Sequence, residues 1–240
     1  MIRILLSLAL GLAFPLYAAK RDSAAARKHR FEPVLQKIEG WTIHVDPQLL
    51  KGEQSDEGKR ALRMLADNLH RISILVPEPQ LTQMRRLEIW IEWEHPILKA
   101  MQYHPSRSWL VARGHDARLA KKVHITRARA LFERGQLLKH PAVVLHELAH
   151  AYHDQILDFD NEEIEAAYES AKTSGKYDKV LLYSGRYVRH YGMNNPKEYF
   201  AEATEAWFYR NDFYPFVRAE LEEHDPQFYR LLKKIWGEKK

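Results

Sequence analysis

The sequence predicts a single α+β domain in which a small, twisted mixed sheet is followed by a lobe of helices. Segments with strand-like alternation all lie before residue 127, and segments with helical spacing dominate after residue 140. About 220 residues remain if the apolar N-terminus is removed, a length that suits one domain. A content of 45% hydrophobic and 11% aromatic residues allows a packed core and argues against general disorder.

The N-terminus has the order of a secretory signal. Arg3 precedes an apolar run over residues 4–16, and the small residues Ala18 and Ala19 follow. This run is shorter than the ~20 residues that a membrane span needs. We therefore expect residues 1–19 to be a signal peptide, with an uncleaved anchor as the alternative. The mature protein would be exported (secreted, periplasmic or at the cell surface), with no stable membrane span after signal cleavage.

A basic, Ala-rich stretch follows, and we expect residues 20–40 to form a linker ahead of one domain over residues 41–240. The first strand is expected at 41–45, where WTIHV alternates between apolar and polar residues. The first helix is expected at about 56–76, where apolar residues recur at helical spacing and the segment Pro-Glu-Pro then stops it.

Two further strands are expected before the helical half. LEIWIEW at 87–93 alternates most clearly, and KVHIT at 122–126 is shorter. The first is expected to be a core strand. The second precedes the helix that carries the chemistry described below, where it could be an edge strand that pairs with substrate; a plain strand of the sheet is the alternative.

Helical spacing dominates the rest of the chain, over the segments 140–157, 162–174, 195–210 and 226–236. Their ends have recognisable signals. Pro141 suits a first helical position, Gly175 closes a helix, and Asn195 and Asp225 each precede a proline as N-cap residues.

Composition excludes several kinds of chemistry. The chain has no Cys, which rules out disulfides, thiolate zinc sites and a cysteine nucleophile. Its formal net charge of +5 is scattered along the sequence, so we expect no nucleic-acid partner. The 13 His are the more unusual feature, and they direct attention to metal and base chemistry.

The pattern HELAH at 146–150 carries that chemistry. On a helix, His146 and His150 lie one turn apart on the same face, where two imidazoles can occupy two corners of a zinc tetrahedron. Glu147 can then reach the water on the metal and act as its base. The alternative is a pair of ordinary histidines with no metal.

The third ligand is not of the metzincin type, which would need glycine at 153 and histidine at 156; the chain has His153 and Ile156. We expect His153 to support the site from outside the ligand set or to lie on the surface. Spacing favours Glu198 as the third ligand and leaves Glu202 as an alternative. Glu198 could instead complete a helix cap, and Glu202 could orient a liganding imidazole.

A phenol near the metal would complete the site, because it can donate a hydrogen bond to the oxyanion that forms when water attacks a peptide carbonyl. Tyr191 is the candidate, with His190 as the alternative donor and a core aromatic as the non-functional interpretation.

HELAH, together with YGMNNPKEYFAEA at 191–203, resembles the catalytic domain of the anthrax lethal factor type of gluzincin metallopeptidases. The resemblance covers about 100 C-terminal residues and implies a zincin-like fold. It implies that Glu198 is the third zinc ligand, that Tyr191 lies over the metal and assists catalysis, and that Glu202 supports the metal site. Pro196 and Lys197, before the ligand, depart from the family pattern without removing a functional group.

We therefore expect an exported, zinc-dependent metalloendopeptidase that acts on a peptide or protein substrate. His146, His150 and Glu198 would bind Zn²⁺, Glu147 would be the general base, and no other cofactor is expected. Two alternatives remain: a catalytically silent protein that keeps the fold to bind a partner, and a hydrolase of cell-wall peptide bridges.

Overall fold

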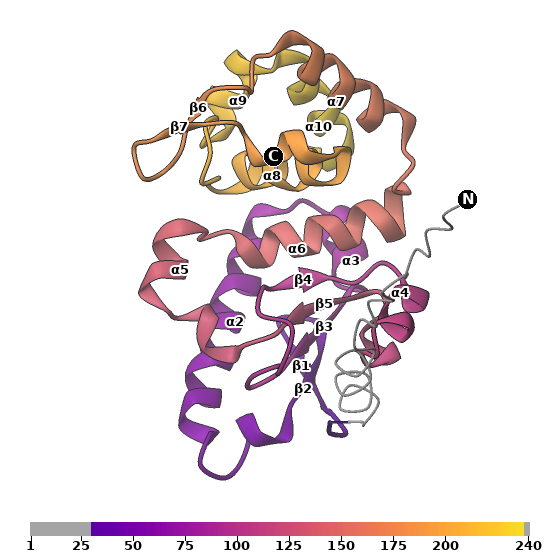
Figure 1. Cartoon of the computed structure of the whole chain (residues 1–240), viewed down its shortest axis with the longest axis vertical. Helices are drawn as coiled ribbons and strands as arrows, with labels where there is room; N and C mark the ends of the chain where they lie inside the picture. Colours follow the sequence, from indigo (N-terminus) through magenta and orange to yellow (C-terminus); the bar gives the residue numbers. More distant parts are fainter. Residues whose placement is uncertain (1–29, 238–240) are drawn as a thin grey trace, which may run out of the picture.

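The computed structural model describes residues 30–237, and the signal peptide expected at residues 1–19 lies outside them. Figure 1 shows two lobes, with a sheet and its helices in one and a group of helices in the other. The strands are β1 (Val34–Ile38), β2 (Trp41–Val45), β3 (Glu88–Ile91), β4 (Gln102–Tyr103), β5 (Lys122–Ile125), β6 (Val180–Leu181) and β7 (Tyr187–Val188). The helices are α2 (Ser55–Leu75), α3 (Gln80–Met84), α4 (Arg107–Ala112), α5 (Arg134–Lys139), α6 (Val143–Tyr152), α7 (Glu162–Ser174), α8 (Pro196–Phe208), α9 (Arg218–His224) and α10 (Pro226–Trp236). The α+β class with a small mixed sheet and a helical C-terminal part is thus confirmed.

The main sheet has the order β1-β2-β3-β5-β4. The three central strands β2, β3 and β5 run parallel, and β1 and β4 pair antiparallel at the two edges. Residues 122–126 are therefore a plain strand of the sheet, as the alternative had it, and not its edge. Strand β4 covers β5 and is the edge nearest to α6 (Figure 1), and with two residues it is too short for alternation to reveal it.

The prediction of a linker over residues 20–40 is also wrong for residues 34–38. Val34–Ile38 form β1, whose five residues pair in register with β2. Val34 and Leu35 are exposed on this strand, so its burial does not follow the simple alternation of a half-buried strand. The basic residues before Val34 led us to extend the predicted linker into the strand.

The long helices follow their sequence signals. Asn161 caps α7 and Gly175 ends it with a φ of 67°, and α10 covers the expected residues 226–236. Helix α6 differs at both ends: it begins at Val143, after Pro141, and continues beyond Tyr152 as a π-turn over His153–Leu157. None of the helices in residues 30–237 is long and apolar enough to cross a membrane.

The sheet is buried on both faces. Ile89 and Ile91 of β3 belong to the main core with α2 and α6, whereas Trp90 packs with Leu110 and Leu119 on the opposite face. Helix α6 lies between the sheet and the second lobe (Figure 1). Residues of α6 therefore have one side on the sheet lobe and another facing α8.

Histidines form a buried polar network near α4, away from α6. His104 Nε2 and His124 Nδ1 lie 3.1 Å apart, and His124 Nε2 lies 3.1 Å from Glu92 Oε1. Burial lowers the pKa of both His104 and His124 to about 3, so both are neutral in the folded protein at neutral pH.

This network predicts loss of stability in mild acid. The unfolded chain takes up protons on these two histidines below about pH 6.5, while the folded chain does so only near pH 3. The free energy of unfolding should therefore fall as the pH decreases from 6.5, by about 1.4 kcal/mol per pH unit for each histidine. His104→Gln should reduce this slope in urea unfolding between pH 7 and 5. His70→Gln, at an exposed position of α2, is the control, and equal slopes for both variants would refute the prediction.

Candidate metal centre

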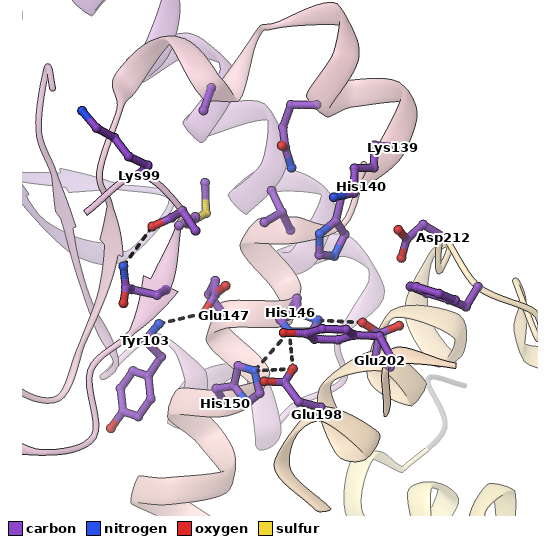
Figure 2. Close-up of a pocket in the computed structure, with 18 of the residues that line it drawn as sticks. Lys99, Tyr103, Lys139, His140, His146, Glu147, His150, Glu198, Glu202 and Asp212 are labelled. Atoms are coloured by element: carbon purple, nitrogen blue, oxygen red, sulfur yellow. Dashed lines mark hydrogen bonds and ion pairs between the residues drawn. The ribbon is translucent and has the colours of Figure 1, made fainter. Parts of the chain in front are cut away.

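Helices α6 and α8 bring three of the predicted residues together. His146 and His150 lie one turn apart on α6, and their Nε2 atoms are 3.1 Å from each other. Glu198 comes from the first turn of α8, and its Oε2 lies 3.2 Å from His146 Nε2 and 3.3 Å from His150 Nε2. Figure 2 shows the three side chains converging from the two helices.

The start of α8 is fixed by its cap. Asn195 Oδ1 accepts hydrogen bonds from the backbone N–H groups of Lys197 and Glu198, both at 3.0 Å, and Pro196 occupies the first helical position. This cap leaves the Glu198 carboxylate free to point at α6. The alternative that Glu198 only completes the cap is therefore wrong.

The three atoms lie at or slightly below the separations of ligand atoms around a small tetrahedral ion. Zinc bonds of about 2.0–2.2 Å place tetrahedral ligand atoms about 3.3–3.6 Å apart. The observed separations among His146, His150 and Glu198 are 3.1, 3.2 and 3.3 Å. Glu198 Oε2 is also buried, and no residue in 30–237 makes a hydrogen bond to it. Two imidazole nitrogens and a carboxylate oxygen that converge in this way, with the oxygen lacking a hydrogen bond, fit a zinc ion.

The charges of the site agree with this fit. Burial opposes ionisation of Glu198, but the adjacent His146 and His150 imidazoles hold its pKa well below the usual range. The carboxyl group is therefore ionised at neutral pH and can act as a metal ligand.

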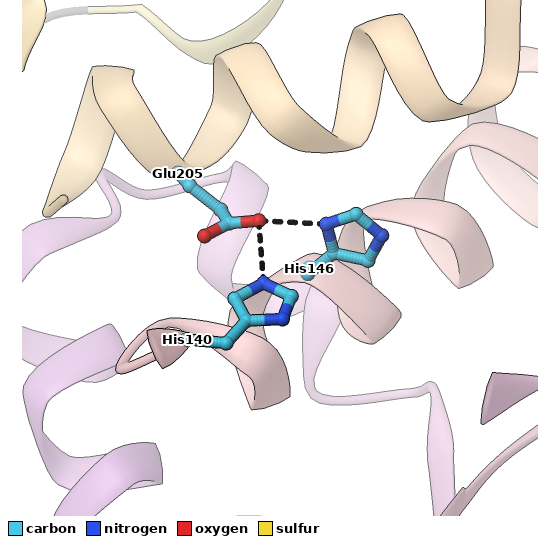
Figure 3. A group of neighbouring side chains, drawn as sticks. All are labelled: His140, His146 and Glu205. Carbon is cyan, nitrogen blue, oxygen red and sulfur yellow. Dashed lines mark hydrogen bonds and ion pairs between the residues drawn. The ribbon is translucent and has the colours of Figure 1, made fainter. Parts of the chain in front are cut away.

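Glu205 orients His146. Its Oε1 lies 2.7 Å from His146 Nδ1 and 2.9 Å from His140 Nε2, as Figure 3 shows. A proton on Nδ1 that is donated to Glu205 leaves the lone pair of Nε2 for a metal. The Glu205 side chain is fully buried. Glu202, which was expected in this supporting role, is 3.8 Å from His146 Nδ1, beyond hydrogen-bond distance.

His140, His146 and Glu205 form a second group that could hold a metal. Their short separations argue for hydrogen bonds instead. One oxygen, Glu205 Oε1, lies within 2.9 Å of both imidazoles, closer than the ~3.3 Å between tetrahedral zinc ligands. We therefore interpret this group as the support of the first one.

Glu147 lies on the other side of the candidate metal position, toward the sheet (Figure 2). Its side chain is buried, and Oε2 accepts a 2.7 Å hydrogen bond from the backbone N–H of Tyr103 in β4. Burial raises the pKa of Glu147. A carboxylate with a raised pKa is better able to take up a proton during a reaction.

Tyr103 is anchored to the end of the same helix. Its phenol donates a 2.5 Å hydrogen bond to Asp154 Oδ2 and accepts one of 3.1 Å from Gln155 Nε2. Lys121 Nζ lies 2.6 Å from the same Asp154 oxygen. The edge strand β4 is therefore connected to the α6 region by the Tyr103 backbone at Glu147 and by the Tyr103 phenol at Asp154.

Tyr191 lies at the start of the 3₁₀ turn Tyr191–Asn194 and lines the same cavity. It is 47% exposed, and the charge of Glu198 raises its pKa, so the phenol keeps its proton. A Cβ on Gly192 would lie 3.0 Å from His190 Nδ1 and 3.1 Å from Tyr199 Cα, so glycine is what lets this turn approach α8.

The alternatives to Tyr191 and the expectation for His153 do not hold. His190 is buried and does not line this cavity, and its Nδ1 accepts the Gly192 N–H as the cap of the turn, so His190 is not placed to donate there. His153 is fully buried beside Phe159 and Phe200, and no residue in 30–237 makes a hydrogen bond to either of its ring nitrogens. It neither supports the site nor lies on the surface, and burial lowers its pKa to about 4.

A cavity of about 680 Å³ contains this site. Both lobes line it, with Tyr103 and its neighbours on the sheet side and Leu182, Arg186 and Phe213 on the helical side. His146, Glu147, His150 and Glu198 all face it (Figure 2). A substrate can therefore reach the candidate metal position and Glu147 from one space.

The two supporting carboxylates predict different effects on metal affinity. Glu205→Gln should weaken zinc binding about 10–100-fold, because it removes the charge that fixes the His146 tautomer. Glu202→Gln is the matched control, one turn earlier on α8, and should weaken binding less. Competition with a fluorescent zinc chelator measures both. A larger loss for Glu202→Gln would restore the role expected from the sequence.

Comparison with protein-family models, with curated proteins and with solved structures finds no match for this chain.

Proposed function

We propose that this protein is a zinc-dependent metallopeptidase with a zincin-like fold of the gluzincin type. His146, His150 and Glu198 would hold the zinc, and Glu147 would act as the general base. The observation that carries the proposal is the convergence of two imidazole nitrogens and one buried carboxylate oxygen within 3.3 Å of one another, beside Glu147 in an open cavity.

Zn²⁺ bound by these three ligands would supply a Lewis acid that polarises the scissile carbonyl and lowers the pKa of the attacking water. Glu147 takes the proton from that water and passes it to the leaving amine. Its Oε2 is held by the Tyr103 N–H, so its position is set before substrate binds. Its raised pKa favours the step in which it accepts the proton.

Tyr191 would donate its phenolic proton in a hydrogen bond to the developing oxyanion. It is partly exposed in the cavity and close enough for the Glu198 charge to raise its pKa. A phenol that stays protonated can donate throughout the reaction.

The edge strand β4 gives the substrate a place to bind. Gln102 pairs with His124 of β5, and the Tyr103 N–H points away from β5 to Glu147. Because this N–H is engaged by Glu147, an extended peptide would add to the sheet through the other main-chain groups on the free edge of β4, which lines the cavity. This arrangement brings a peptide bond next to Glu147 and favours an enzyme over a silent binding protein.

We also propose that the protein acts outside the cytoplasm, because residues 1–19 have the order of a secretory signal.

Incubation of the zinc-loaded chain with a random peptide library, followed by mass spectrometry of the products, tests the proposed function. We expect new peptide termini that disappear when a zinc chelator is added and return with added zinc. A library that stays intact at every zinc concentration would refute it.

The anchor of β4 predicts a separate kinetic effect. Tyr103→Phe removes the hydrogen bonds of the phenol to Asp154 and Gln155, which loosens the strand whose N–H holds Glu147. We expect kcat to fall about tenfold with zinc content unchanged, because a misplaced base costs rate rather than metal affinity. Tyr152→Phe is the matched control: it also removes a phenolic hydrogen bond, to Gln83, but away from the cavity. Equal kcat values for the two variants would contradict the prediction.

A further inference from the structure

The exposed charges around the cavity are of one sign. Four basic side chains line it, namely Lys99, Arg127, Lys139 and Arg186, of which all but the half-buried Arg127 are exposed. The four acidic residues that line it are Glu147, Glu198, Glu202 and Asp212, and none of them is exposed. The walls that a substrate meets first are therefore basic, and the carboxyl groups lie at the floor.

The carboxyl groups at the floor already have roles or partners. Glu147 accepts the Tyr103 N–H, and Glu198 faces the two imidazoles. Glu202 and Asp212 are buried, with only 2% and 3% of their surface exposed, so their carboxyl groups do not lie on the walls. These groups therefore do little to neutralise the basic walls.

Two of the four cations are not engaged in ion pairs. Lys99 lies 3.4 Å from Glu94, and Arg127 lies 3.5 Å from Glu133. Within residues 30–237, by contrast, neither Lys139 nor Arg186 has an ion-pair partner, although the Lys139 charge acts on Asp212. An unpaired cation beside a cavity is available to a carboxylate of a ligand.

The two unpaired cations lie on opposite walls. Lys139 ends α5 in the sheet lobe and lies near His140 (Figure 2), whereas Arg186 belongs to the tight turn between β6 and β7 in the helical lobe. Lys99 lies farther along the cavity, beside the segment that leads into β4 (Figure 2). A peptide in the cavity therefore passes cations on both sides.

We propose that the preferred substrates are acidic peptides, with Asp or Glu side chains flanking the bond that is cleaved, and that Lys139 and Arg186 are their principal recognition residues. This inference rests on the proposed peptidase function. Complementary charge at the walls speeds the encounter of enzyme and substrate and orients the bound peptide, and both effects weaken with added salt.

Three peptide libraries test it, each with a random core flanked on both sides by two Glu, two Gln or two Lys residues. The zinc-loaded wild-type protein should cleave the Glu library with at least a tenfold higher kcat/KM than the Gln library, and the Lys library most slowly. Raising the salt from about 0.05 to 0.5 M should remove most of this preference. Equal rates, or a preference for Lys, would overturn the inference.

Charge reversal assigns the preference to the two residues. Lys139→Glu/Arg186→Glu should lose the preference for Glu and should cleave the Lys library faster than the Glu library. Lys51→Glu/Arg107→Glu is the matched control, because it changes the net charge equally at two exposed positions away from the cavity. If both double variants behave alike, the two residues are not the determinants.

Binding separates the failure of this inference from that of the proposed function. Fluorescence anisotropy of labelled Glu, Gln and Lys peptides with Glu147→Gln protein measures recognition without turnover. If no library is cleaved but the Glu peptide still binds most tightly, the peptidase proposal fails and the acidic preference stands. Equal affinities for the three peptides would refute the acidic preference whatever the turnover.

Discussion

Glu147→Gln should reduce peptide hydrolysis by about 10²–10⁴-fold while zinc stays bound, because a positioned general base contributes about this much to the rate. The glutamine has nearly the same shape, and its amide oxygen can still accept the hydrogen bond from the Tyr103 N–H. It lacks only the ability to accept a proton. The variant therefore tests the chemistry with little change to the fold.

The measurement is kcat/KM on a cleaved library peptide, together with the zinc content of the same sample. Glu169→Gln is the control, because Glu169 is exposed on α7, away from the cavity. Hydrolysis at the wild-type rate by the zinc-loaded Glu147→Gln variant would remove the proposed mechanism.

Glu198→Ala should weaken zinc binding by more than 100-fold, a larger loss than removal of a supporting group causes. It removes the carboxylate that closes the triangle with His146 and His150. It also leaves the cap of α8 in place, because the cap is made by Asn195 Oδ1, which accepts hydrogen bonds from the backbone N–H groups of Lys197 and Glu198. The loss would therefore report on metal ligation and not on unfolding of the helix.

Glu202→Ala is the decisive comparison for this assignment. It lies one turn later on α8, and its carboxylate is not within hydrogen-bond distance of His146. Equilibrium zinc titration should place it much closer to the wild type than Glu198→Ala. If Glu202→Ala loses zinc and Glu198→Ala keeps it, the ligand assignment is reversed.

The sequence predicts the elements that have strong local signals. Helices α7, α8 and α10 begin at Asn or Asp caps, and α7 and α10 also end where expected, whereas α8 ends two residues early at Phe208; caps and apolar spacing act within a few residues. Elements of few residues escaped detection, such as β4 and the hairpin β6–β7. They form because long-range partners stabilise them, and no local pattern records those partners.

The candidate site likewise has residues that local spacing predicts and residues whose roles depend on distant parts of the chain. The spacing of His146 and His150 is a property of one helix, and the position of Glu198 follows from the cap of the next. Glu205 and Tyr103 are not among the residues that we predicted for the site, and their partners lie 59 and 44 residues away in the chain. Glu205 follows Glu198 at i+7 on the same face of α8, and this spacing is a signal that could have identified it.

His153 marks the limit of reasoning from a single helix. Helical geometry places it on nearly the same face as His150, which suggested a role at the site or exposure to solvent. Its surroundings depend on Phe159 and Phe200, which belong to other segments and enclose it. The sequence of one helix does not reveal which segments cover each of its faces.

Anomalous diffraction at the zinc edge from crystals of the zinc-loaded protein locates the metal directly. We expect one strong peak, bounded by His146 Nε2, His150 Nε2 and a Glu198 carboxylate oxygen, at about 2.0–2.2 Å from each. The second group of possible ligands, His140, His146 Nδ1 and Glu205, gives a clear alternative position. A peak there, or none at His150 and Glu198, would refute the proposed metal site.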